Sequence, residues 1–364
     1  MKLLHLGVYD RNIGDNIALA NLQYSIDKYC SKDIEVIGFN LENLWYQKNS
    51  VASVRALYND IVDTVDFILV GGGGLLEYGG YQEKDSGWKL PFWEETLKFI
   101  KIPIYYYGVG VNTFRGGGEY SDKAKKALTD TIYHANGFAV RNDGSYNKLK
   151  NWIGLPEDAT NKVEVVPDPG LLHLDRFGIE RKQKINRLGF QPAINQSTGI
   201  NNNRFNGEAN LNILLNKFKD AKVYPHTSKD FRFGKPVITV EEFANKYRVF
   251  ENLDLYLEKY KEIDYVVAMR GHGQMISMGM NIPGIYLSTQ DKVRDFSIEN
   301  GFEDYNIDMT DELWEEKLDS SIKKLTDHNS KYLKDWYELR DEFIKKCHEV
   351  DEKWIKTKLS KWLV

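Results

Sequence analysis

Arg270 and His272 are the residues whose types and spacing best suit chemistry in this chain. They close the apolar run Tyr-Val-Val-Ala-Met-Arg-Gly-His at 265–272, and a helix is expected to begin at about Gly273. Arginine is a permanent cation, histidine exchanges protons near neutral pH, and the start of a helix offers unpaired N–H groups. Such a strand-to-helix corner is where open α/β sheets bind ligands. The corner therefore predicts a site for an anion that also exchanges a proton.

A second group of polar residues follows the first apolar run, in Asn12-Ile-Gly14-Asp15-Asn16. Gly14 permits a tight turn, while the side chains of Asn12 and Asp15 could face a ligand or cap the following helix. Asp15 could equally serve only as the cap. The spacing is not that of a dinucleotide-binding fingerprint.

Glycines gather after two further predicted strands. Four of them, Gly71 to Gly74, follow Asp66-Phe-Ile-Leu-Val70 directly, and Gly108 and Gly110 follow the strand at 104–108. Such a run lets backbone amides approach an anion or a sugar closely, and no structural reason for four glycines is evident. The Gly-Lys-Ser/Thr ending of a P-loop is missing. The run is therefore interpreted as a ligand-binding loop.

Three more polar residues stand at predicted strand ends. Arg141 offers a planar fork of donors to a carboxylate or phosphate, although a salt bridge to Asp143 or Asp168 would explain it equally well. Asp168 lies in the turn Pro-Asp-Pro-Gly at 167–170, and His226 ends a strand of the second half, where it could touch substrate.

Short apolar runs alternate with amphipathic stretches, which is the pattern of parallel βαβ units. The strands expected in the first half are 3–9, 34–39, 65–70, 104–108, 137–140 and 163–166. Those expected in the second half are 188–192, 221–224, 265–269, 284–287 and 305–307, with helices at 207–218, 252–260 and 273–280. The fold class predicted is α/β, with two Rossmann-like domains whose parallel sheets face a cleft.

The predicted domains are 1–175 and 186–310, separated by a polar, charged linker. Residues 311–364 are predicted to form helices that pack on the second domain or cross to the first. The last segment, 345–364, carries six Lys against three acids, so it could rest on an anionic membrane face. Packing on its own protein is the simpler interpretation.

Composition narrows the class of protein. A net charge of −4 argues against a nucleic-acid partner, because phosphate binding leaves a basic footprint. Cys30 and Cys347 lack metal-ligand spacing, and no His/Asp/Glu cluster indicates a metal. Neither a signal peptide nor a membrane span is evident, so the cytoplasm, including the inner face of the membrane, is the expected location.

Taken in order, these pieces resemble the polysaccharide pyruvyl transferase family. The matching elements are the turn at 12–15, the loop at 71–75, Gly108-Val-Gly110, Arg141 with Ser145, Asp168-Pro169, Arg270-Gly-His272 and Asn281-Ile-Pro283. The resemblance covers about residues 3 to 290. It implies a fold similar to GT-B glycosyltransferases, an active site in the interdomain cleft, and transfer of pyruvate from phosphoenolpyruvate to a sugar as a ketal.

The residues suit that reaction. Arg141, Arg270 and the glycine loops would bind the donor, His272 would be the general acid, and Asp15 would orient or deprotonate an acceptor hydroxyl. No cofactor is expected beside phosphoenolpyruvate as donor substrate. The expected acceptor is a sugar of a cell-surface glycan, or of a lipid-linked precursor, and self-association is left open. The alternatives are a GT-B glycosyltransferase that uses a sugar nucleotide and a noncatalytic sugar- or anion-binding protein.

Overall fold

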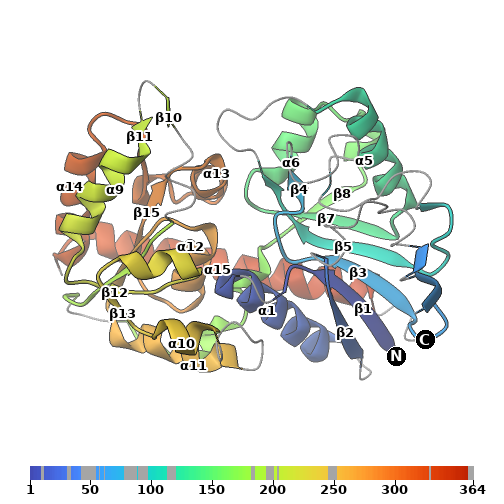
Figure 1. The fold of residues 1–364 in the computed structure, drawn as a ribbon, viewed down its shortest axis with the longest axis horizontal. Helices are drawn as coiled ribbons and strands as arrows, with labels where there is room; N and C mark the ends of the chain where they lie inside the picture. The colour runs from blue at the N-terminus through green and yellow to red at the C-terminus, as the bar shows by residue number, and fades with distance from the viewer. Residues whose placement is uncertain are drawn as a thin grey trace. The chain divides into compact units, whose positions relative to one another are not determined.

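The chain forms two compact units, each built on a six-stranded parallel sheet (Figure 1). The computed structural model describes residues 1–9, 12–30, 34–41, 55–56, 58–60, 62–77, 88, 97–112, 120–181, 185–193, 201–202, 205–244, 252–327 and 329–359. Unit 1 comprises Met1–Tyr9, Leu22–Pro169 and Cys347–Val364, and unit 2 comprises Asp10–Asn21 and Gly170–Lys346. The division at Pro169 falls before the expected linker.

The sheet of unit 1 has the order β2-β1-β3-β5-β7-β8, with every pairing parallel. Its strands are β1 Lys2–Gly7, β2 Glu35–Asn40, β3 Phe67–Gly71, β5 Ile104–Val109, β7 Gly137–Arg141 and β8 Val163–Val166. A separate pair joins β4 (Leu76–Glu77) to β6 (Val111–Asn112). β3, β5 and β7 are buried throughout, as expected for strands covered on both faces.

Alternate side chains of this sheet enter two apolar clusters. Leu69 and Tyr107 pack with α1 and the end of α15, while Ile68 and Tyr106 pack with α5. The helical segments around the sheet are α1 Ile13–Tyr29, α5 Asp122–His134, α6 Ser145–Asn147, η1 Lys148–Ile153 and α7 Glu157–Thr160. The first turns of α1 count with unit 2 and its remainder with unit 1.

The sheet of unit 2 has the order β13-β12-β9-β14-β15-β16, and it is also wholly parallel. Its strands are β9 Leu188–Gln191, β12 Lys222–Val223, β13 Lys235–Pro236, β14 Tyr265–Ala268, β15 Gly284–Ser288 and β16 Asn306–Asp308, beside a hairpin of β10 Asn201–Asn202 and β11 Phe205–Asn206. Its helices are α9 Gly207–Lys217, α10 Val240–Glu242, α11 Leu253–Glu258, α12 Gly271–Gly279, α13 Asp291–Glu299 and α14 Trp314–Thr326. Short helical turns occupy Pro169–Leu171, Leu174–Phe177, Ser228–Arg232, Lys259–Glu262 and Glu303–Tyr305. The expected fold class, two Rossmann-like domains with parallel sheets, is confirmed.

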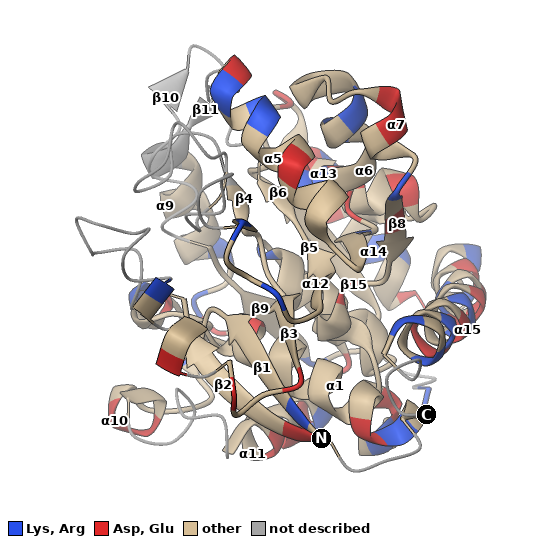
Figure 2. Cartoon of the chain, turned by 90° about the vertical axis from the view of Figure 1, so that its right-hand side faces the viewer, with Lys and Arg blue, Asp and Glu red and all other residues tan. Residues whose placement is uncertain are grey.

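The last helix, α15 (Lys331–Lys358), is divided between the units at Lys346. Trp354, Ile355 and Leu359 are buried in the cluster of unit 1 that contains Tyr107. Lys and Arg alternate with Asp and Glu along the helix, so its exposed side is not a purely basic face (Figure 2). Packing on its own protein is therefore confirmed for this part of the segment, while Trp362 and Leu363 lie outside the described residues. No helix within the described ranges is long and apolar enough to cross a membrane.

Candidate active site

The carboxyl end of β14 carries the predicted chemical centre of unit 2. Strand β14 ends at Ala268, and α12 begins at Gly271 with Arg270 as its N-cap, two residues earlier than expected. β14 pairs with β9, which is the point where the strand order of this sheet reverses. Such a switch point is where doubly wound sheets bind ligands. The prediction of a strand-to-helix corner is confirmed, with His272 in the first turn of the helix.

Asp15, in the first turn of α1, lies opposite His272. Nδ1 of His272 lies 3.3 Å from Oδ1 of Asp15, close enough for an ion pair when the imidazole is protonated. A Cβ atom on Gly14 would lie only 2.5 Å from Cβ of His272, so glycine is required for this approach. Asn12 caps the helix instead of Asp15, since its Oδ1 accepts the N–H of Gly14 at 2.9 Å. Asp15 is therefore more than a helix cap.

Arg270 is held in place by several contacts. Its Nε donates to the carbonyl of Pro192 at 2.9 Å, and its Nη2 donates to Thr227 Oγ1 at 3.1 Å and to Asp230 Oδ1 at 2.8 Å. Its backbone N–H donates to Oε1 of Gln191 at 2.9 Å. Arg270 is only 4% exposed and Asp230 is fully buried. The predicted anion clamp is thus also one half of a buried ion pair.

Gly273 and His226 are buried residues of the same corner. A Cβ on Gly273 would lie 2.4 Å from Oε1 of Gln191, so this glycine admits the side chain that holds Arg270. His226 is fully buried at the end of β12, and its backbone carbonyl accepts the N–H of Ile13. Burial lowers the pKa of His226 well below its ordinary value, and the nearby Arg270 and His272 lower it further. Its ring is therefore neutral, and its predicted contact with substrate stays a prediction.

Arg141, at the end of β7 in unit 1, is enclosed by carboxylates. Its Nη2 lies 2.8 Å from Asp143 Oδ2, and its Nη1 lies 3.0 Å from Asp168 Oδ2. Asp143 also accepts from the hydroxyl of Ser145, which in turn accepts the N–H of Val111 at 2.8 Å. The salt-bridge interpretation therefore holds for both aspartates. A role of Arg141 or Asp168 in binding a substrate stays a prediction.

Most of the predicted glycine loops have a structural cause. A Cβ would lie 1.8 Å from the Tyr107 carbonyl oxygen at Gly71 and 2.1 Å from Asn112 Nδ2 at Gly74. Gly72 has φ +79°, a conformation that favours glycine. The expectation that nothing structural requires four glycines is therefore wrong for three of them. A Cβ on Gly73 would meet no atom within 4 Å, so the fold alone does not explain this glycine.

Gly108 within β5 and Gly110 just after it also have structural causes. Gly108 has φ +60°, and a Cβ on Gly110 would lie 2.1 Å from Nη2 of Arg141. The two loops are joined by backbone hydrogen bonds from Gly72 to Tyr107 and from Gly110 to Gly73. β3 and β1 are neighbours at the switch point of this sheet, so the loop still lies where a ligand is expected.

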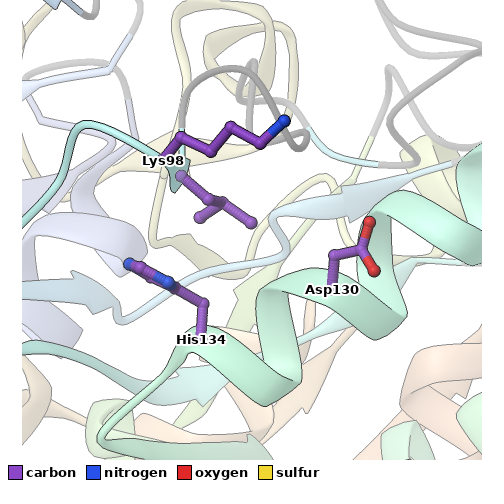
Figure 3. A pocket seen from close by; sticks show the side chains of 4 residues that line it. Lys98, Asp130 and His134 are labelled. Carbon is purple, nitrogen blue, oxygen red and sulfur yellow. The ribbon is translucent and has the colours of Figure 1, made fainter.

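A surface pocket of about 180 Å³ in unit 1 lies elsewhere (Figure 3). Leu97, Lys98, Asp130 and His134 line it, and Asp130 pairs with Lys126. His134 ends α5 just before β7, which places the pocket at the amino ends of the strands rather than at their carboxyl ends. Among the described residues, no group of three His, Cys, Asp or Glu is placed to hold a metal ion.

Asp230, Thr227 and Gln191 were not predicted as members of the site. Thr227 and Asp230 form a capping box around the turn Ser228–Arg232, and the Thr-x-x-Asp spacing was a usable signal. Gln191 carried no signal, because a glutamine at a strand end has no distinctive pattern. The structure brings Asn12, Asp15, His226, Arg270, His272 and Gly273 together in unit 2, and Gly71 to Gly74, Gly108, Gly110, Arg141 and Asp168 together in unit 1.

The fold and this corner define a Rossmann-like α/β protein with a histidine–aspartate pair and an arginine at the switch point of a parallel sheet. The sequence model for polysaccharide pyruvyl transferases matches residues 12–291, which is most of the chain. The chain therefore belongs to the polysaccharide pyruvyl transferase family. No curated protein matches it at a significant level.

Several solved structures are distantly similar. S. aureus MnaA with UDP has a TM-score of 0.49 and 11% identity, covering 100% of this chain and 96% of its own. The Methanocaldococcus jannaschii UDP-GlcNAc 2-epimerase with UDP-GlcNAc and UDP has a TM-score of 0.49 and 15% identity, and the match covers 95% of this chain and 99% of the epimerase. The spinosyn rhamnosyltransferase SpnG with spinosyn aglycone has a TM-score of 0.45 and 12% identity, and the match covers 98% of this chain and 99% of SpnG. Similarity at this level says nothing about the ligand of this chain.

Proposed function

We propose that this chain transfers pyruvate from phosphoenolpyruvate to two hydroxyls of one sugar, forming a ketal and releasing phosphate. The observation that carries the proposal is the His272–Asp15 pair at the start of α12, in a chain that belongs to the polysaccharide pyruvyl transferase family. The reaction needs an acid beside an anionic donor. A titratable imidazole at a helix N-terminus meets both needs.

His272 is the proposed general acid. With Nδ1 facing Asp15, the nitrogen assigned to proton exchange with the substrate is Nε2. The acid adds its proton to C3 of the enol, which becomes the methyl group, and C2 becomes open to attack by the first sugar hydroxyl. That hydroxyl returns its proton to His272. The second hydroxyl then displaces phosphate, which carries the second proton away, so atoms and charges balance.

Beside its expected part, orienting or deprotonating an acceptor hydroxyl, Asp15 is assigned a second one. A carboxylate beside Nδ1 orients the imidazole and stabilises its protonated form, as in other aspartate–histidine pairs. The exposed fraction of the Asp15 side chain is 25%, so it also remains within reach of an acceptor hydroxyl. Orientation of His272 is the role that the 3.3 Å contact supports directly.

The carboxylate and phosphate of the donor are assigned to the start of α12 and to Arg270. The first N–H groups of a helix attract anions, and the N-cap arginine adds a fixed positive charge at the same end. Arg270 is already paired with Asp230, so the first N–H groups of the helix are assigned much of the attraction. The acceptor is proposed to be a sugar of a cell-surface glycan or its lipid-linked precursor, modified in the cytoplasm.

The test is phosphate release from phosphoenolpyruvate in the presence of candidate acceptor sugars, with mass spectrometry of the products. Acceptor-dependent phosphate release with a pyruvylated sugar as product is the expected result. Release of phosphate without a pyruvylated product would indicate a hydrolase. No turnover of phosphoenolpyruvate with any glycan acceptor, together with turnover of a sugar nucleotide, would refute the proposal.

A further inference from the structure

Asp230 has no role in the reaction described above, yet its carboxylate connects two parts of the corner in unit 2. Oδ1 lies 2.8 Å from Nη2 of Arg270, and Oδ2 accepts the backbone N–H groups of His226 at 3.0 Å and Thr227 at 2.9 Å. The side chain is fully buried. One carboxylate therefore ties the loop after β12 to Arg270, the N-cap residue of α12.

Arg270 reaches across the sheet to make this contact. It follows β14, its Nε donates to Pro192 just after β9, and its Nη2 donates to Thr227 just after β12. These strands are neighbours in the order β12-β9-β14. The guanidinium thus lies over the carboxyl ends of adjacent strands, at the place where the strand order reverses. Asp230 holds Nη2 of the guanidinium at this place.

We propose that Asp230 is a positioning residue, which fixes the guanidinium of Arg270 in the orientation that binds the anionic donor. The inference rests on the proposed function, since it takes phosphoenolpyruvate as that donor. An arginine side chain has many rotamers, and immobilising it before binding removes that cost from the binding step. Thr227 supports the same orientation through its hydroxyl.

Asp264 provides a matched control in the same unit. Its carboxylate also accepts two backbone N–H groups, from Asn186 and Arg187, and pairs with the Arg187 guanidinium at 2.8 Å. It is 6% exposed and directly precedes β14, so it lies at the opposite end of the strand from Arg270. Asp264→Asn removes comparable contacts without touching the corner.

The experiment is calorimetric titration of wild type, Asp230→Asn and Asp264→Asn with phosphoenolpyruvate, beside their thermal unfolding. We expect Asp230→Asn to weaken phosphoenolpyruvate binding roughly tenfold or more, and Asp264→Asn to leave it within about twofold at a comparable loss of stability. In an Arg270→Gln background, Asp230→Asn should weaken binding no further, because a positioning residue acts through its partner.

Equal affinity in wild type and Asp230→Asn would overturn the inference, as would equal losses in both aspartate variants. If Asp230→Asn does not fold, Thr227→Val replaces it, with an expected loss of about threefold, and unchanged affinity in Thr227→Val would then overturn the inference. Wild-type protein that does not bind phosphoenolpyruvate would refute the proposed function instead, so the two failures are distinguishable.

Discussion

Arg141 and Arg270 are both buried arginines at the carboxyl end of a parallel strand, but their surroundings differ. Arg141 lies between two carboxylates, Asp143 and Asp168, and it is 5% exposed. Arg270 has one carboxylate, Asp230, and shares its end of the sheet with the start of α12 and with His272. In the first cluster both carboxylates contact the guanidinium itself, whereas in the second only Asp230 contacts Arg270 and the other carboxylate, Asp15, lies against His272.

An arginine at a strand end therefore does not identify an anion site by itself. Two carboxylates around one guanidinium repel a further anion, so the Arg141 cluster is best suited to holding the loops of unit 1 together. A helix N-terminus and an imidazole beside Arg270 attract an anion and exchange a proton. We therefore assign donor chemistry to unit 2.

The largest effect is expected when the imidazole of His272 is removed. His272→Ala should lower phosphate release about 10²- to 10⁴-fold, because it removes the general acid, while phosphoenolpyruvate affinity changes only a few-fold. Steady-state phosphate release and calorimetry measure the two quantities. His134→Ala, at the surface pocket of unit 1, is the control and should keep normal turnover. Near-normal turnover in His272→Ala would remove the acid assignment.

Arg141→Met tests the structural role assigned to Arg141. It leaves Asp143 and Asp168 buried without their cation, so the free energy of unfolding should fall by about 3–5 kcal/mol. Urea unfolding measures this loss, and the phosphoenolpyruvate affinity of the folded fraction should stay unchanged. A stable Arg141→Met protein that no longer binds phosphoenolpyruvate would show that Arg141 binds the donor.

A buried histidine in unit 1 gives a pH test that does not involve the His272 corner of unit 2. Burial lowers the pKa of His5 from 6.5 to about 4, so below pH 6.5 the unfolded chain takes up a proton that the folded chain does not. Stability is therefore full above pH 6.5 and falls by about 1.4 kcal/mol per pH unit toward pH 4.

His5→Gln should reduce this slope without changing phosphoenolpyruvate affinity at neutral pH. Urea unfolding at several pH values measures the slope. Some slope should remain, because His226 in unit 2 also has a lowered pKa. An unchanged slope in His5→Gln would show that His5 does not contribute to the pH dependence.

The smallest stability effect is expected at Gly73. A Cβ there meets no atom within 4 Å, so Gly73→Ala should change the free energy of unfolding by less than about 0.5 kcal/mol. Gly71→Ala is the contrast, because its Cβ would lie 1.8 Å from the Tyr107 carbonyl oxygen, and it should be severely destabilising. Acceptor-dependent turnover lost in a stable Gly73→Ala protein would add a binding role for unit 1.

Sequence patterns predicted the strands of both sheets well, because fully buried parallel strands are continuous apolar runs. β13 was missed, since Lys235–Pro236 is short, exposed and without such a run. The Arg270–His272 corner was found because both residues lie in one local pattern. The His272–Asp15 contact and the role of Asp230 were not, because they join residues far apart in the sequence. The structural causes of Gly71 and Gly74 were missed for the same reason, since their close neighbours are visible only in the fold.

Titration calorimetry with phosphoenolpyruvate, beside UDP- and GDP-sugars, shows which donor the protein binds. Wild-type protein should bind phosphoenolpyruvate saturably, and Arg270→Ala should bind it much more weakly although thermal unfolding shows it to be folded. Binding of a sugar nucleotide with indifference to phosphoenolpyruvate would contradict the account and favour a glycosyltransferase.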